Sequence, residues 1–101
     1  METFKLGEIL GKKMFGEDLG VEKAHIMFKL ARKNNWGGKY DRLEHFKRFK
    51  DLSRIVKELA EGGWILIHRK STFTGIALNT EHKREIVEFI EKKMPYVKGM
   101  I

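Results

Sequence analysis

Apolar residues recur every three or four positions over much of the chain, which is the spacing of helices that bury one face. The first two stretches of this kind are residues 2–14, with Leu6, Ile9, Leu10 and Met14, and residues 21–34, with Val21, Ala24, Met27, Phe28 and Ala31. The segment from Gly16 to Gly20 separates the two predicted helices. Turn-forming residues from Asn34 to Gly38 end the second one.

Residues 41–60 continue the helical spacing, with apolar side chains at Leu43, Phe46, Phe49, Leu52, Ile55, Val56 and Leu59. Asp41 followed by Glu44 suits a helix start, because carboxylates favour the unpaired amides and the positive dipole end there. The pattern fits one continuous helix, and it fits equally well two shorter helices joined by a tight turn near Phe46 to Arg48. Glu61-Gly62-Gly63 ends the segment.

A β-hairpin is predicted next, because Trp64–Lys70 and Phe73–Asn79 flank the short loop Ser71-Thr72. With that loop, Ile65 faces Leu78 and Ile67 faces Ile76 on one side of the ribbon. Arg69 and Thr74 continue this side toward the loop, and Gly75 permits a bulge. The hairpin is therefore apolar at its base and basic at its tip.

The chain ends in one more predicted helix, residues 81–94, capped by Thr80 and followed by Pro95. Its apolar stripe is Ile86, Val87, Ile90 and Met94. The tail after Pro95 is unusually apolar. Helices followed by a two-stranded ribbon form the winged helix arrangement, so the expected fold is mainly α with a small β-hairpin: a winged helix-turn-helix with extra N- and C-terminal helices.

The charge of the chain is concentrated in one segment. The net charge is +7, from 21 basic and 14 acidic residues. Residues 29–54 contain nine basic residues against three acidic ones, a net +6, and the basic ones are Lys29, Arg32, Lys33, Lys39, Arg42, Lys47, Arg48, Lys50 and Arg54. Such clustering is typical of a surface that binds a polyanion, although a solvated Lys-rich surface would give the same count.

Composition excludes several other classes of protein. There is no Cys, which rules out disulfides, zinc fingers and thiol catalysis. The longest apolar run, Trp64 to Ile67, is far shorter than the roughly 20 residues of a membrane span. No secretory signal is recognisable at the start, so a cytoplasmic location is expected. The absence of Gln and the many Lys and Glu residues resemble the bias of thermophile proteins.

One stretch carries a resemblance to a known family. From Arg54 to Ile65 the sequence reads R-I-V-K-E-L-A-E-G-G-W-I. It resembles the end of the recognition helix and the start of the wing in winged helix-turn-helix regulators, particularly MarR-like and related archaeal ones, whose pattern is roughly R-h-V-K-x-L-x-x-x-G-h-I with h apolar. After the hairpin, Leu78 to Ile86 is similar to the family's L-T-x-x-G-R-E-I helix start.

The length of 101 residues predicts a single domain, here a winged helix domain over residues 1–101 with its core at residues 21–80. The resemblance covers about residues 21–90. Residues 2–15 and 81–101 are surplus to the core and are candidate dimerisation helices. The resemblance implies where DNA would be contacted. The expected contacts are Lys50, Ser53, Arg54 and Lys57 around the recognition helix, and Arg69, Lys70, Ser71 and Thr72 at the wing tip. Arg48 is added because it forms an exposed basic ridge with Lys50, Arg54 and Lys57. Arg can read guanine in the major groove, and Lys and Ser commonly contact phosphates.

The expected function is that of a small double-stranded DNA-binding protein, a transcription regulator that acts as a homodimer. The recognition helix would enter the major groove and the wing would contact the backbone or the minor groove. The main alternative is a winged helix module that binds other proteins within a larger complex. RNA binding is a third option, but the sequence has no evident surface aromatic platform. The four histidines are scattered and no catalytic constellation is present, so no enzyme activity, metal or cofactor is expected.

Overall fold

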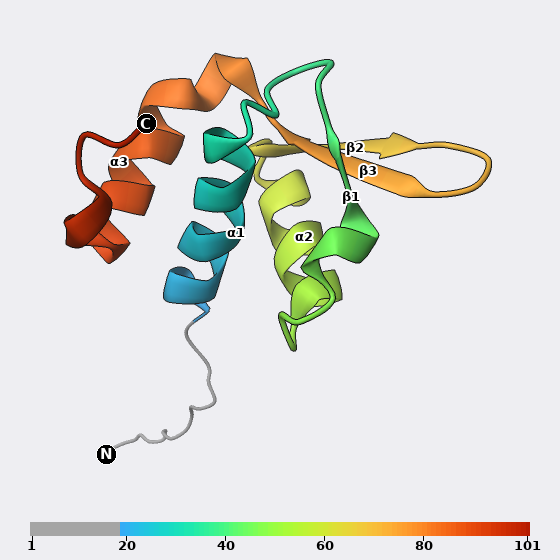
Figure 1. Ribbon diagram of the computed structural model, residues 1–101, viewed down its shortest axis with the longest axis horizontal. Coiled ribbons are helices and arrows are strands. Elements are labelled where there is room, and N and C mark those ends of the chain that lie inside the picture. The colour runs from blue at the N-terminus through green and yellow to red at the C-terminus, as the bar shows by residue number, and fades with distance from the viewer. Residues whose placement is uncertain (1–18) are drawn as a thin grey trace.

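Helix α1 (Gly20–Arg32) lies between α2 (Leu52–Glu61) and α3 (Lys83–Lys93), and a β-hairpin projects beyond the helices on the α2 side (Figure 1). The computed structural model describes residues 19–101. This part of the chain is an α/β domain with three α-helices and a three-stranded antiparallel sheet. The helix expected over residues 2–14, with its candidate role in dimerisation, lies outside the described residues.

The sheet contains one strand that the sequence did not predict. Its strands are β1 (Asp41–Arg42), β2 (Ile65–Arg69) and β3 (Thr74–Leu78), in the order β1-β3-β2. Asp41 pairs with Ile76 and Arg42 with Gly75. The expectation that Asp41 caps a helix was therefore wrong, because its backbone is part of a strand. A strand of two residues has too few positions to show an alternating pattern.

Residues 41–60 form two helical segments and not one continuous helix. A 3₁₀ turn, η1 (Leu43–Phe46), follows β1, and α2 begins at Leu52. Residues 47–51 form the turn between them. α2 ends at Glu61, one residue after the predicted end, and Gly63 then adopts a positive φ of 83°, which glycine tolerates without strain.

The predicted register of the hairpin is confirmed. Ile65 pairs with Leu78 and Ile67 with Ile76, and Arg69 pairs with Thr74 next to the loop. The bulge that Gly75 would permit does not form, because the pairing continues through His68 and Gly75. Gly75 serves another purpose: a Cβ there would overlap the ring of Tyr40, so only glycine leaves room for that ring.

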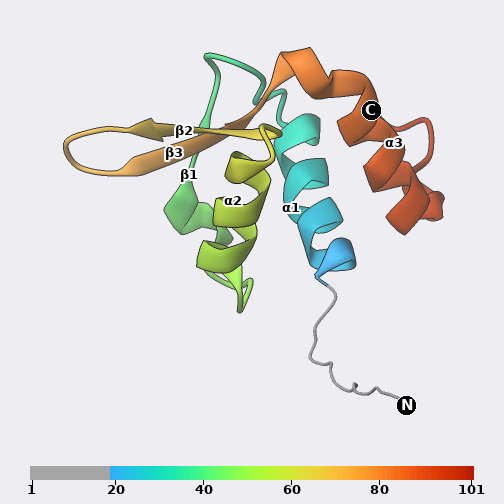
Figure 2. The same ribbon diagram turned by 180° about the vertical axis from the view of Figure 1, so that it is seen from behind.

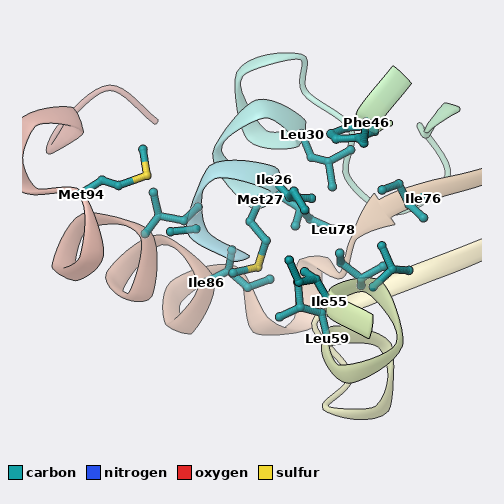
Figure 3. Close-up of a cluster of buried hydrophobic side chains, with 14 of the residues drawn as sticks. Ile26, Met27, Leu30, Phe46, Ile55, Leu59, Ile76, Leu78, Ile86 and Met94 are labelled. Atoms are coloured by element: carbon teal, nitrogen blue, oxygen red, sulfur yellow. The ribbon is translucent and has the colours of Figure 1, made fainter. Parts of the chain in front are cut away.

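The core lies where the three helices meet the base of the sheet (Figure 3). α1 has neighbours on two sides and buries a wider arc than the predicted stripe. Ile26 and Leu30 are fully buried, whereas Val21 is 48% exposed. Met27 is the third labelled side chain of α1, and the other labelled side chains come from outside this helix: Phe46, Ile55, Leu59, Ile76, Leu78, Ile86 and Met94.

The helical segment at the C-terminus begins at Thr80, one residue earlier than predicted. Asn79, and not Thr80, caps its first turn, since the Asn79 side chain accepts a hydrogen bond from the backbone N–H of Glu81. A 3₁₀ turn, η2 (Thr80–His82), leads into α3 (Lys83–Lys93), and Pro95 starts a last turn, η3 (Pro95–Val97). Val97 is buried against the core, so part of the apolar tail belongs to this domain.

Candidate nucleic-acid interface

Helix α2 presents polar side chains to solvent, and its larger apolar residues are mostly buried. Ile55, Val56 and Leu59 are buried. Ser53, Arg54 and Lys57 are exposed on the opposite side, and Lys50 is exposed in the turn that precedes the helix. These are four of the residues for which the sequence predicted DNA contacts.

Two of these residues share a hollow with the hairpin. An open hollow of about 530 Å³ lies between α2 and the sheet, and Ser53, Lys57 and Arg69 line it together with Thr74. Its floor is apolar, and Glu61 also lies at its edge. The fold thus brings α2 and the inward-facing side of β2 together, although their residues are separated in the sequence.

The charge of α2 itself is balanced. Arg54 Nε donates to Glu58 Oε2 at 3.1 Å, and Lys23 Nζ lies 2.7 Å from Glu58 Oε1. These two hydrogen bonds, from Lys23 and then Arg54, lower the pKa of Glu58 below its ordinary value. With Lys57 and Glu61, the helix carries two cations and two carboxylates. The positive charge near the hollow therefore comes from its flanks, above all from the hairpin.

The hairpin tip projects away from the helices in both views (Figure 2). Lys70, Ser71 and Thr72 are exposed there, and the backbone N–H of Lys70 donates to the Phe73 carbonyl at 2.9 Å. This hydrogen bond closes the loop between the strands. The tip is thus a narrow, basic projection that can reach past the rest of the domain.

Arg48 does not join this group of residues. It lines a second hollow, of about 440 Å³, with Lys29, Arg32 and Lys33 of the α1 segment and with Tyr96 of the tail. Its guanidinium lies over the ring of Phe49, 5.2 Å from the centroid. Of the nine predicted residues, Arg48 is the one that the structure places at a different hollow.

The structure also assembles a group of residues from which the sequence analysis had named only Arg42, in the basic segment, and Lys70, as a DNA contact. Together with Tyr40, His68 and Phe73 they gather on the outer face of the sheet. They come from three separate segments, so no local motif marks them. The only feature of the sequence that indicated this group was the alternating direction of side chains along β2, together with the glycine opposite His68.

Other functional chemistry is sparse in the described part of the chain. Within residues 19–101, no group of three or more His, Cys, Asp or Glu side chains is arranged to hold a metal ion. None of the helices described here is both long and apolar enough to cross a membrane. No protein-family model, curated protein or solved structure matches this chain.

Proposed function

We propose that this chain is a winged helix protein that binds double-stranded DNA, with α2 in the major groove and the β2–β3 hairpin on the backbone or the minor groove. Helix, strand, short helix, helix and hairpin follow one another in the order that this fold requires. The sheet order β1-β3-β2 fits it as well. The major groove of B-DNA is wide enough to admit an α-helix.

The observation that carries the proposal is the shared hollow. Ser53 and Lys57 of α2 and Arg69 of β2 line the same open surface. A helix face and a hairpin that flank one hollow can contact a duplex together. Phosphate contacts from the hairpin would fix the register, and base contacts from α2 would supply sequence information.

A role as a transcription regulator and a homodimer extends this proposal. One small domain contacts few base pairs, and a two-fold dimer doubles the number by binding two half-sites. Exposed apolar side chains in the tail, at Tyr96, Met100 and Ile101, are available for such an interface.

A protein-binding winged helix module remains the second candidate. The balanced charge of α2 favours it, because Glu58 and Glu61 weaken the attraction of this helix for phosphates. Under this alternative, the exposed apolar tail would contact a different protein and the hollow would not bind DNA.

Binding across a salt series separates the two candidates. Mixed-sequence duplex DNA, single-stranded DNA and duplex RNA are titrated with the protein at several salt concentrations. We expect a preference for duplex DNA and a steep loss of affinity with salt, because each phosphate contact contributes about 0.9 to the slope. Lys57→Ala should reduce the slope, and Lys92→Ala on the distant helix α3 should not. A weak affinity that does not change with salt would contradict the proposal.

A further inference from the structure

The outer face of the hairpin carries a cluster of rings and cations, of which only Lys70 also belongs to the proposed duplex contact. Along β2, Ile67 and Arg69 face α2 and line the hollow there. His68, between them, therefore points to the opposite face. On that side the Tyr40 ring contacts both His68 and Phe73, with Lys70 over Tyr40 and Arg42 over Phe73, and we call these five residues the outer cluster. Phe73 also lines a hollow with Leu43 and Leu52.

The rings of the outer cluster are in mutual contact. The ring centroids of Tyr40 and His68 are 4.9 Å apart with the planes inclined at 28°, which is a stacked arrangement. Those of Tyr40 and Phe73 are 6.0 Å apart. The guanidinium of Arg42 lies over the Phe73 ring at 4.3 Å, and Lys70 Nζ lies over the Tyr40 ring at 5.4 Å.

Contacts to the backbone hold the cluster in place. The Tyr40 ring lies against Gly75, where any Cβ would overlap it. His68 Nε2 is 3.0 Å from the Gly37 carbonyl oxygen, and since a carbonyl only accepts, Nε2 carries the proton and donates. A surface that is ordered before binding loses less conformational entropy when a ligand arrives.

The cations of the outer cluster have little to neutralise them. Among residues 19–101, the carboxylate nearest to Arg42 is that of Glu44, 4.0 Å away, and both side chains are half exposed. Within the same residues, Lys70 has no carboxylate partner. The rings of Tyr40, His68 and Phe73 are themselves only partly buried. The surface therefore offers positive charge and aromatic faces together.

This combination matches an unpaired nucleic-acid strand. An acidic protein would neutralise the cations but would not use the rings, and a paired duplex hides its base faces in its own stack. A single strand presents phosphates and open bases at once, and bases stack on aromatic side chains and on Arg guanidinium planes. We propose that the outer cluster binds unpaired bases, so that the preferred ligand is duplex DNA with a single-stranded extension.

This inference rests on the proposed function, because it assigns the duplex to the hollow and the extension to the outer cluster. Arg69 on one face of β2 and His68 on the other lie only one residue apart. The hairpin would therefore stand at the junction, between the paired and the unpaired part of the DNA.

Three ligands test the proposal: a blunt duplex, the same duplex with an extension of unpaired thymines, and the same duplex with an abasic extension of equal length. The two extensions carry the same number of phosphates, so only base stacking distinguishes them. We expect the thymine extension to raise affinity about tenfold over the blunt duplex. The abasic extension should raise it much less.

Two conservative variants identify the residues responsible. Phe73→Leu keeps an apolar side chain but removes the ring, and Arg42→Lys keeps the charge but removes the planar group. Both should lose most of the gain from thymines and bind the blunt duplex as the wild type does. Lys57→Ala is the matched control, since it should weaken blunt-duplex binding and leave the gain unchanged. Thermal unfolding of each variant shows that the fold is retained.

The possible failures can be told apart. If the thymine and abasic extensions raise affinity over the blunt duplex equally, the stacking proposal is overturned and duplex binding is unaffected. The same conclusion follows if both variants keep the increase that thymines give. No binding of the blunt duplex would overturn the proposed function. In that case, a free thymine strand still tests the outer cluster. If the wild type binds this strand and Phe73→Leu does not, the outer cluster is supported. If both proteins bind it equally well, the proposal for the outer cluster is overturned.

Discussion

Asp41 connects three parts of the chain through one buried carboxylate. Its Oδ2 accepts a hydrogen bond from Lys33 Nζ at 2.8 Å, and its Oδ1 accepts from His45 Nδ1 at 2.6 Å and from the backbone N–H of Arg42 at 2.9 Å. The side chain is only 7% exposed. Burial acts to raise its pKa and is the largest single influence, but the hydrogen bonds from Lys33, His45 and Arg42 together outweigh it. The pKa of Asp41 therefore lies below its ordinary value.

This lowered pKa predicts how stability depends on pH. The carboxylate stabilises the folded state at pH values above its ordinary pKa of about 3.9, and that contribution is lost as the pH falls through the lower folded value. Asp41→Asn should reduce the free energy of unfolding at neutral pH by about 1 to 3 kcal/mol and weaken its dependence on pH below about 4. Denaturant unfolding at a series of pH values measures this, with the exposed Asp51→Asn as control. Identical pH profiles for wild type and Asp41→Asn would refute the assignment.

In the proposed duplex complex, Arg54 is the side chain that we expect to reach a base edge. It is 56% exposed on the outward face of α2, and its Nε is held by Glu58. Arg54→Ala should cost about 1 to 3 kcal/mol at a specific duplex site and relax the base preference there. Arg54→Lys should restore only part of the loss, because the bidentate fork is absent. Selection of bound sequences, with affinities measured at one salt concentration, gives the result. If both variants selected the wild-type motif, Arg54 would contact phosphate or nothing.

At the scale of elements, what the sequence predicted correctly depends on near neighbours, although the local caps expected at Asp41 and Thr80 were misplaced. The hairpin register followed from a short loop between two apolar runs, and the end of α2 followed from Gly62 and Gly63. Pairing across long separations was missed. β1 is too short to show a pattern, and the outer cluster needs Tyr40 to meet His68 across the sheet. In the candidate interface, the exposed face of α2 was predictable, whereas the separate position of Arg48 was not.

The hairpin tip carries its own prediction. Arg69 and Lys70 are exposed and make no hydrogen bond with their side chains among residues 19–101, so replacing both with Ala should leave the fold intact. Binding to blunt duplexes should weaken by a similar factor for every sequence, and the salt slope should fall by about 1 to 2. Lys92→Ala and Lys98→Ala together remove the same charge elsewhere and serve as the control. An unchanged slope in the hairpin variant would mean that the tip does not touch phosphate.

At the scale of the whole molecule, the two ends of the domain have different surfaces. The hairpin end is basic and carries both the hollow and the outer cluster. The opposite end, formed by α3 and the tail, exposes Tyr96, Met100 and Ile101. If two copies joined through their apolar tails, their basic hairpins would lie away from the dimer interface. Binding to two half-sites requires this arrangement.

The tail therefore provides the test of the dimer. Deleting residues 95–101 would remove Val97 from the core, so the loss of a dimer would be mixed with a loss of stability. Replacing Met100 and Ile101 with Ser avoids this, because both side chains are exposed. We expect the wild type to sediment as a dimer and this double variant as a folded monomer whose unfolding midpoint no longer depends on protein concentration. Affinity for a palindromic site should fall far more than affinity for a half-site, since only the former is bound by both copies. A wild type that sediments as a monomer at the concentrations used for binding would show that each chain binds DNA alone.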